Sequence, residues 1–217
     1  MGRERAADGH HAVKLPIDPT SVKGFLDPEE GAALQRWAQD AVAWGPCLEV
    51  GSYCGKSALY LGAACKARGG MLFTVDHHRG SEEMQPGWEH HDPETWDAKA
   101  GSMETLPFLR DTLRRAHLEE NVVAIVGRSA TVARYWATPL ALLFIDGGHS
   151  MELALADYRG WARHVMPGGY LAIHDVFPNP EDGGRPPFEI YKAAVASRQF
   201  RELEQVKSLR LLVRLGG

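Results

Sequence analysis

The chain has 217 residues, of which 44% are hydrophobic and 24% are charged, as in an ordinary globular protein with one substantial core. It carries 24 Lys and Arg against 28 Asp and Glu, a net charge of −4, which gives no electrostatic reason to expect a nucleic-acid or membrane partner. Its three cysteines cannot all pair and lack the spacing of zinc ligands. We expect one cytoplasmic domain over residues 1–217, without signal peptide or membrane span, in which residues 1–20 are flexible.

The first predicted helix begins at Pro28. Asp27 is suited to cap it, and Glu29 and Glu30 favour the positive end of the helix dipole. Apolar side chains then recur at helical spacing, at Leu34, Trp37, Ala38 and Ala41. We expect this helix to cover one face of a sheet.

A short apolar strand at residues 47–50 is followed by a glycine turn, in the stretch CLEVGSYCGKS. Such a turn between a buried strand and a helix is typical of a nucleotide site. The turn does not match a dinucleotide fingerprint, G-x-G-x-x-G, because Tyr53 stands where the second glycine is needed, which argues against NAD. A P-loop, G-x-x-x-x-G-K-[ST], is excluded because Val50 stands where its first glycine is needed. The pattern that remains is E-x-G-x-x-x-G, which ends at Gly55.

Four further strands are predicted at residues 71–75, 122–126, 141–145 and 170–173, with helical segments between them. The tail alternates as a hairpin would over residues 200–206 and 209–215, and turns at Lys207 and Ser208. The predicted fold is α/β: a Rossmann-like, doubly wound, seven-stranded sheet, mostly parallel with a C-terminal antiparallel hairpin and with helices on both faces.

Ionisable residues follow three of the predicted strands. Asp76 ends the second strand, Asp146 ends the fourth with His149 three residues on, and Asp175 follows the fifth. Because parallel strands place their carboxyl ends at one edge, we expect these residues to share a rim beside the glycine turn. Asp76, about 20 residues past that turn, is placed to accept hydrogen bonds from the hydroxyls of a ribose.

Two blocks of sequence carry a family resemblance. E-x-G-x-x-x-G resembles the first motif of the class I S-adenosylmethionine (SAM)-dependent methyltransferases. FIDGGHS, a helix, PGG and then AIHDV resemble the bacterial metal-assisted O-methyltransferases, including small enzymes that methylate sugar hydroxyls in natural products and polysaccharides. The resemblance covers most of residues 45–177. It implies SAM as cofactor and a last strand inserted between the fifth and sixth.

The resemblance also implies roles for single residues. The cofactor would contact Glu49, Gly51, Ser52, Tyr53, Gly55, Ser57, Asp76, His77, Ser129 and Asp146. A magnesium-type ion would be held by Asp146, His174 and Asp175. His174 departs from the family, in which this position is acidic or an amide, and imidazole is a poorer ligand than oxygen for a hard cation.

His149 occupies the position at which some members of this family place a catalytic lysine. An alcohol is a poor nucleophile until its proton leaves, and a positioned base contributes roughly 10²–10⁴-fold. Histidine titrates near neutral pH, where an unperturbed lysine does not. We therefore predict His149 as the general base, with Asp146 as a second catalytic residue.

Residues 79–105 form a long polar insertion, which we expect to be a lid or substrate loop. Trp88 and Trp96 offer flat apolar faces for a sugar or an aromatic alcohol; the alternative is that both fold back as a local cluster, for example at a homodimer contact.

Two other functions remain open: a phenolic or catechol-like O-methyltransferase, and a non-catalytic SAM-binding protein. An NAD-dependent enzyme is a more remote alternative. We expect a small-molecule acceptor and no nucleic-acid or membrane partner.

Overall fold

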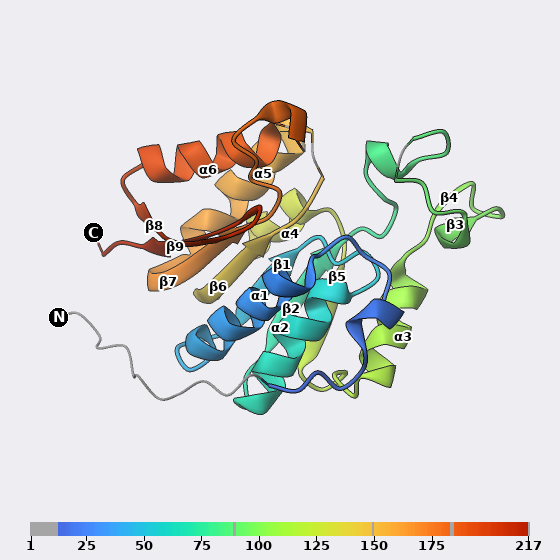
Figure 1. The fold of residues 1–217 in the computed structure, drawn as a ribbon, viewed down its shortest axis with the longest axis horizontal. Helices are drawn as coiled ribbons and strands as arrows, with labels where there is room; N and C mark the ends of the chain where they lie inside the picture. Colours follow the sequence, from blue (N-terminus) through green and yellow to red (C-terminus); the bar gives the residue numbers. More distant parts are fainter. Residues whose placement is uncertain (1–12, 89, 149, 183–184, 217) are drawn as a thin grey trace.

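The computed structural model describes residues 13–88, 90–148, 150–182 and 185–216. Its main sheet consists of seven strands: β1 (Cys47–Val50), β2 (Leu72–Asp76), β5 (Val122–Val126), β6 (Leu140–Ile145), β7 (Val165–Ile173), β8 (Phe200–Val206) and β9 (Leu209–Arg214). Six α-helices surround it: α1 (Pro28–Ala41), α2 (Lys56–Ala67), α3 (Leu106–Arg115), α4 (Ser129–Tyr135), α5 (Met151–Trp161) and α6 (Pro186–Ala196). This is the predicted Rossmann-like fold (Figure 1).

The strands lie in the order β5-β2-β1-β6-β7-β9-β8. The pairs from β5 to β7 are parallel, whereas β9 is antiparallel to both β7 and β8. The last strand of the chain, β9, therefore lies between β7 and β8, which are the fifth and sixth strands of this sheet in chain order, as the family resemblance implied. Val206 pairs with Leu209, so the hairpin turns at Lys207 and Ser208 as predicted.

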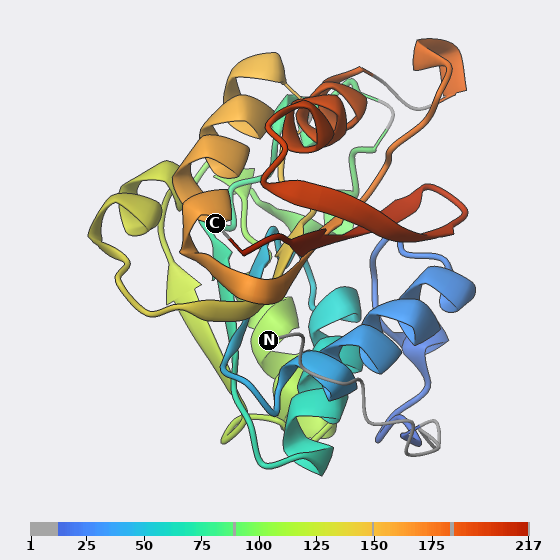
Figure 2. The ribbon, with the colours of Figure 1, turned by 90° about the vertical axis from the view of Figure 1, so that its left-hand side faces the viewer.

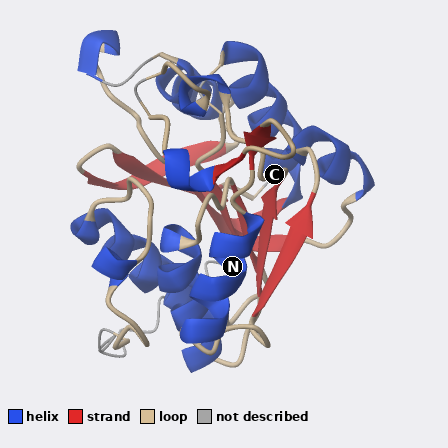
Figure 3. Cartoon of the chain, turned by 90° about the vertical axis from the view of Figure 1, so that its right-hand side faces the viewer, coloured by secondary structure: helices blue, strands red, loops and turns tan. Residues whose placement is uncertain are grey.

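Helices cover both faces of the sheet, α1 to α3 on one side and α4 to α6 on the other (Figures 2 and 3). Alternation along β6 explains the two layers: Leu142 and Phe144 pack on the α1 side, and Leu143 and Ile145 on the α5 side. All four side chains are buried because parallel strands in such a fold are covered on both faces.

The strand predicted to begin at Tyr170 begins instead at Val165, as β7, and the preceding helix α5 ends at Trp161. Leu140 of β6 pairs with Val165 of β7, and the next pair is Leu142 with Tyr170. The chain therefore moves by two residues in β6 but by five in β7 between these pairs. Residues 166–169, which include the sequence PGG, therefore form a bulge within a strand, a form of irregularity that Pro and Gly favour.

The insertion after β2 has structure of its own, which sequence reasoning missed. It contains a two-stranded antiparallel sheet, β3 (Trp96–Asp97) and β4 (Ser102–Met103). It is tied to the segment before α1, because Lys23 pairs with Asp92 and with Glu94, each at 2.6 Å. In Figure 1 the insertion projects at the upper right, above α3 and away from the strands of the main sheet.

The cysteines Cys47, Cys54 and Cys65 are all buried, and none of them forms a disulfide. Within the described ranges, no helix combines the length and the apolar character that crossing a bilayer would require. Of the segment predicted to be flexible, residues 1–12 lie outside the described part of the chain.

Candidate functional site

The glycine turn after β1 lies directly against the end of β6. Gly51 has φ +90, and a Cβ built on it would lie 2.0 Å from the carbonyl oxygen of Asp146. Only glycine can adopt this φ without strain and still permit such an approach. Gly55, with φ +92, then leads into α2. The backbone of the turn is therefore fixed by residues that lack a side chain.

Asp76 holds the turn from the neighbouring strand. One carboxylate oxygen accepts hydrogen bonds from the backbone N–H groups of Ser52, at 3.0 Å, and Tyr53, at 2.9 Å. The other accepts from the N–H of His78 at 2.7 Å. Since an ionised carboxylate offers about four acceptor sites, Asp76 retains acceptor capacity beyond these three bonds.

Glu49 lies beneath the turn and is fully buried. The Thr74 hydroxyl donates to Glu49 Oε2 at 2.6 Å. Burial raises the pKa of Glu49 to about 7, although hydroxyl groups of Ser57 and Thr74 act in the opposite direction. Glu49 Oε1 and Ser52 Oγ are buried without a hydrogen-bond partner among the described residues. Two such atoms at one turn fit a polar ligand there, because unpaired buried polar groups are costly.

A second carboxyl, Asp157 of α5, lies across β6 from this turn and was not predicted. A Cβ on Gly147 would lie 2.6 Å from Asp157 Oδ2. Burial raises the pKa of Asp157 to about 6, while a hydrogen bond with Ser129 lowers it. Ser129 Oγ also accepts from the indole N–H of Trp161 at 2.7 Å. Ser129 thus belongs to a polar group under the loops that follow β5 and β6.

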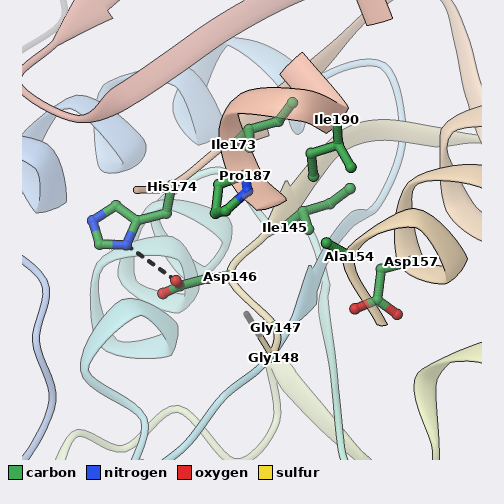
Figure 4. Close-up of a pocket in the computed structure, with 10 residues that line it drawn as sticks. All are labelled: Ile145, Asp146, Gly147, Gly148, Ala154, Asp157, Ile173, His174, Pro187 and Ile190. Carbon is green, nitrogen blue, oxygen red and sulfur yellow. Dashed lines mark hydrogen bonds and ion pairs between the residues drawn. The ribbon is translucent and has the colours of Figure 1, made fainter. Parts of the chain in front are cut away.

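The third group consists of Asp146, His174 and Asp175 at the ends of β6 and β7. His174 Nδ1 lies 3.0 Å from Asp146 Oδ1 and 3.4 Å from Asp175 Oδ2. Figure 4 shows the first of these contacts on one side of a small pocket, with Asp157 on the opposite side. His174 Nε2 contacts Glu30 Oε2 of α1 at 2.9 Å. Asp175 has φ +55, so its backbone is in the left-handed region.

These three side chains fit a divalent cation. They each offer one ligand atom, and the three atoms lie within 4.8 Å of one another. Adjacent ligands about 2.1 Å from an octahedral ion lie about 3.0 Å apart, close to the distance between His174 Nδ1 and Asp146. Burial lowers the pKa of His174, but the charges and hydrogen bonds of Asp146, Asp175 and Glu30 raise it well above its usual value. The three carboxylates around the imidazole of His174 therefore favour a positive charge between them, which a proton or a metal ion can supply.

The structure brings most of the predicted cofactor residues together. Around the glycine turn lie Glu49, Gly51, Ser52, Tyr53, Gly55, Ser57, Asp76 and Asp146. Ser129 belongs to the Asp157 group. His77 is exposed, and its Nδ1 accepts from the N–H of Arg79 at 3.0 Å. His149, the predicted base, lies outside the described residues.

Sequence reasoning missed three buried polar residues at the site. Glu30 has the pattern of an ordinary first-turn acid, and Asp157 that of a polar residue within a helix. His78 has φ +59, is 1% exposed and lies 2.8 Å from Thr105 Oγ1 through its Nδ1. Its position two residues after Asp76 was the available signal, because polar residues after a strand end often serve the site.

Several solved structures of O-methyltransferases have a fold similar to that of this chain. The O-methyltransferase TomG from Streptomyces achromogenes, solved with SAM, is 15% identical, with a TM-score of 0.62 and coverage of 88% of this chain and 82% of TomG. An O-methyltransferase from Bacillus cereus, solved with S-adenosylhomocysteine (SAH), is 17% identical, with a TM-score of 0.63 and coverage of 90% and 86%. The O-methyltransferase NovP is 15% identical, with a TM-score of 0.64 and coverage of 87% and 80%.

The sequence itself matches the methyltransferase domain family over residues 48–176, more than half of the chain. The matched region begins in β1 and ends just after β7, so it contains the glycine turn and the Asp146–His174–Asp175 group. The protein belongs to this methyltransferase family.

Proposed function

We propose that the protein transfers the methyl group of SAM to a hydroxyl oxygen. The observation that carries the proposal is the position of the glycine turn, with its two unpartnered polar atoms, against the strand that supplies Asp146. A methyl donor over that turn would lie next to the acids and imidazole that an alcohol substrate needs. The proteins of similar fold that are O-methyltransferases favour the same reaction.

The cofactor residues have distinct tasks in this proposal. Gly51 and Gly55 permit the backbone to approach the methionine part, and Ser52 and Glu49 offer it their unpartnered oxygens. Asp76 uses its remaining acceptor capacity for the ribose. The group that contains Ser129 receives the adenine. Tyr53, Ser57, His77 and Asp146 complete the predicted contacts.

In the reaction, His149 accepts the proton of the acceptor hydroxyl, and the oxygen attacks the methyl carbon in line with the departing sulfur. The proximity of the aligned reactants can contribute roughly 7–11 kcal/mol in ideal cases. Asp146, His174 and Asp175 would hold a divalent ion, which when bound lowers the pKa of a hydroxyl that touches it. Without it, Asp146 still orients the site through its contact with His174.

For the acceptor we propose a sugar or oligosaccharide. The support for a sugar acceptor is an aromatic platform, defined here as Phe25, Tyr53 and His90. The insertion also carries the exposed Trp88. Phe25 is 62% exposed, with ring centroids 5.9 Å from Tyr53 and 5.2 Å from His90. Flat apolar faces next to polar side chains suit a pyranose ring. The chain also resembles, in overall appearance, the mycobacterial sugar 1-O-methyltransferase of methylmannose polysaccharide synthesis.

A phenolic acceptor is the second candidate, because Phe25 and Trp88 could equally stack on an aromatic ring. Incubation of the protein with labelled SAM and either mannosides or phenols, with and without a chelator, separates the two. We expect label in the mannoside and less of it with chelator. Label only in phenols would move the assignment to the second candidate.

A non-catalytic SAM-binding protein would label neither class of acceptor. It would bind SAH, seen as a rise in melting temperature, and its His149→Ala variant would behave like the parent. For the proposed enzyme, we expect His149→Ala to lose roughly 10²–10⁴-fold in kcat and to bind SAH as the parent does.

We further propose one domain over residues 1–217, with residues 79–105 as the substrate insertion. A cytoplasmic location is supported by the unpaired, buried thiols. A homodimer remains a proposal that sedimentation analysis would test.

A further inference from the structure

Glu30 is a buried carboxylate far from the predicted site in sequence but in contact with it in space. It stands in the first turn of α1 and is 3% exposed. The N–H and hydroxyl of Ser208 donate to Glu30 Oε1 at 2.9 and 2.7 Å. An unpaired buried carboxylate would be strongly destabilising, and these two hydrogen bonds offset that effect. The turn between β8 and β9 thus fixes Glu30 in place.

The second oxygen of Glu30 fixes the orientation of His174. Oε2 lies 2.9 Å from His174 Nε2, and an ionised carboxylate can only accept, so Nε2 carries a proton. The ring atom that faces Asp146 and Asp175 is therefore Nδ1. Metal-binding histidines commonly donate their other ring N–H to a carboxylate in this way, which fixes the tautomer and raises the basicity of the ligand nitrogen.

We propose that Glu30 is a positioning residue that aims His174 Nδ1 at a cation shared with Asp146 and Asp175, and that this donor set prefers Co²⁺ and Mn²⁺ to Mg²⁺. The inference rests on the proposed function, because the cation would lie where the proposed reaction takes place. Glu30 and Ser208 both lie outside the part of the chain that matches the family. The support for His174 is thus supplied by the first helix and the last hairpin of this particular chain.

The preference follows from the ligand atoms. Mg²⁺ demands near-octahedral oxygen ligands and gives up water reluctantly. Imidazole suits first-row transition ions, whose affinity at a given site rises from Mn²⁺ to Co²⁺. One nitrogen and two carboxylates therefore predict affinities in the order Co²⁺, Mn²⁺ and Mg²⁺, from the tightest to the weakest.

Calorimetry on the full chain, freed of metal by chelator and loaded with SAH, tests the preference. We expect Co²⁺ to bind at least tenfold more tightly than Mg²⁺, and bound Co²⁺ to show a visible absorption band altered by nitrogen coordination. His174→Asp supplies a third carboxylate and should reduce the ratio of Co²⁺ to Mg²⁺ affinity. A parent protein that binds Mg²⁺ as tightly as Co²⁺, or that binds neither, would overturn the inference.

The variant Glu30→Gln tests the positioning role. Because the N–H of Ser208 can only donate, the Gln oxygen should stay with Ser208, and the Gln NH₂ should then face His174 Nε2. Nε2 must become the acceptor, so the ring proton moves to Nδ1 and blocks the cation. We expect Co²⁺ affinity to fall roughly 10- to 100-fold, as for other lost partners of metal-binding histidines.

Two matched variants separate orientation from general loosening. Glu29→Gln changes the neighbouring carboxylate, whose side chain is 73% exposed, and should keep the parent affinity for Co²⁺. Ser208→Ala removes one of the bonds to Glu30 Oε1 and should lower the melting temperature while affinity stays within about threefold. Equal Co²⁺ affinity in Glu30→Gln and Glu29→Gln would show that Glu30 does not orient the ligand.

The two proposals can fail separately. Tight Co²⁺ binding that depends on Glu30, without transfer of label to any acceptor, would overturn the proposed function and leave the metal site standing. Transfer of label by a protein that has no measurable affinity for divalent ions would overturn the inference about Glu30 and leave the transferase standing.

Discussion

At the scale of single residues, the backbone of the glycine turn is the most constrained part of the proposed site. A side chain at Gly51 would meet a carbonyl oxygen, which cannot rotate away as a flexible side chain would. The motif in the sequence indicated that glycines were needed here, and the structure gives the reason for Gly51: close approach to β6.

Gly51→Ala should therefore damage both stability and cofactor binding. A left-handed φ costs a non-glycine residue about 1–2 kcal/mol, and the contact of 2.0 Å with Asp146 adds to it. We expect a fall of several degrees in melting temperature and at least 100-fold weaker SAH binding by calorimetry. Gly87→Ala is the matched control, since Gly87 has φ +91 and nothing within 4 Å of its added Cβ. Similar SAH affinity in both variants would contradict this account.

Glu49 makes stability depend on pH. Its pKa is about 7 in the folded state, against 4.5 when unperturbed. Below pH 4.5 both states hold the proton, so there is no penalty. As pH rises from 4.5 to about 7, the unfolded state releases its proton first and the folded state loses stability, by an amount on the order of 3 kcal/mol at most; above pH 7 the effect is constant.

Glu49→Gln removes this titration. Urea unfolding should therefore show that the variant gains stability over the parent between pH 5 and pH 8. Parallel curves for parent and variant over that range would mean that Glu49 does not titrate as described.

At the scale of elements, the sequence predicted correctly the strands whose residues alternate in polarity or form a continuous apolar run. The prediction failed where Pro and Gly, which are typical of turns, lie within a strand. The strand at residues 122–126 and the first strand have the predicted bounds. The start of β7 was missed because Pro167 and Gly168 are typical of turns, and here they lie in a bulge. The proximity of Asp146 and Asp175 was predictable from parallel topology; the contact of Glu30 with His174 was not, because nothing local connects α1 with β7.

The aromatic platform gives an element-scale prediction. Phe25 precedes α1, and Lys23 connects its segment to the insertion. Since an aromatic contact contributes about 0.5–1.5 kcal/mol, Phe25→Ala should raise the KM for the sugar acceptor roughly 2- to 10-fold and leave the KM for SAM unchanged. Tyr135→Ala, which removes a ring that is 80% exposed on α4, should change neither. Equal effects of the two variants would remove Phe25 from the acceptor site.

At the scale of the whole molecule, a single sheet runs from β5 to β8 and carries core residues on both faces. The family match ends at residue 176, but β9 pairs with β7 along residues 170–173. The hairpin is therefore part of the central sheet, and Glu30 connects it with α1 and with the end of β7.

The variant Leu212→Ala tests whether the hairpin and the rest of the sheet unfold together. Leu212 is fully buried in β9, and such a truncation costs about 2–5 kcal/mol. We expect the entire urea transition to shift, with coincident curves from tryptophan fluorescence and circular dichroism. Leu215→Ala, at a side chain that is 40% exposed, should shift it far less. Two separate transitions would contradict the single domain.

Cys54 gives the glycine turn a chemical reporter. Cys54 is 1% exposed, and burial raises the pKa of its thiol to about 12, so an alkylating reagent can modify it only after the turn has opened. Cys47 and Cys65 lie in β1 and α2 and should become reactive only on deeper unfolding. The alkylation rate of Cys54, followed by mass spectrometry, thus measures how often the turn opens. A ligand seated on the turn should slow that reaction in proportion to its occupancy.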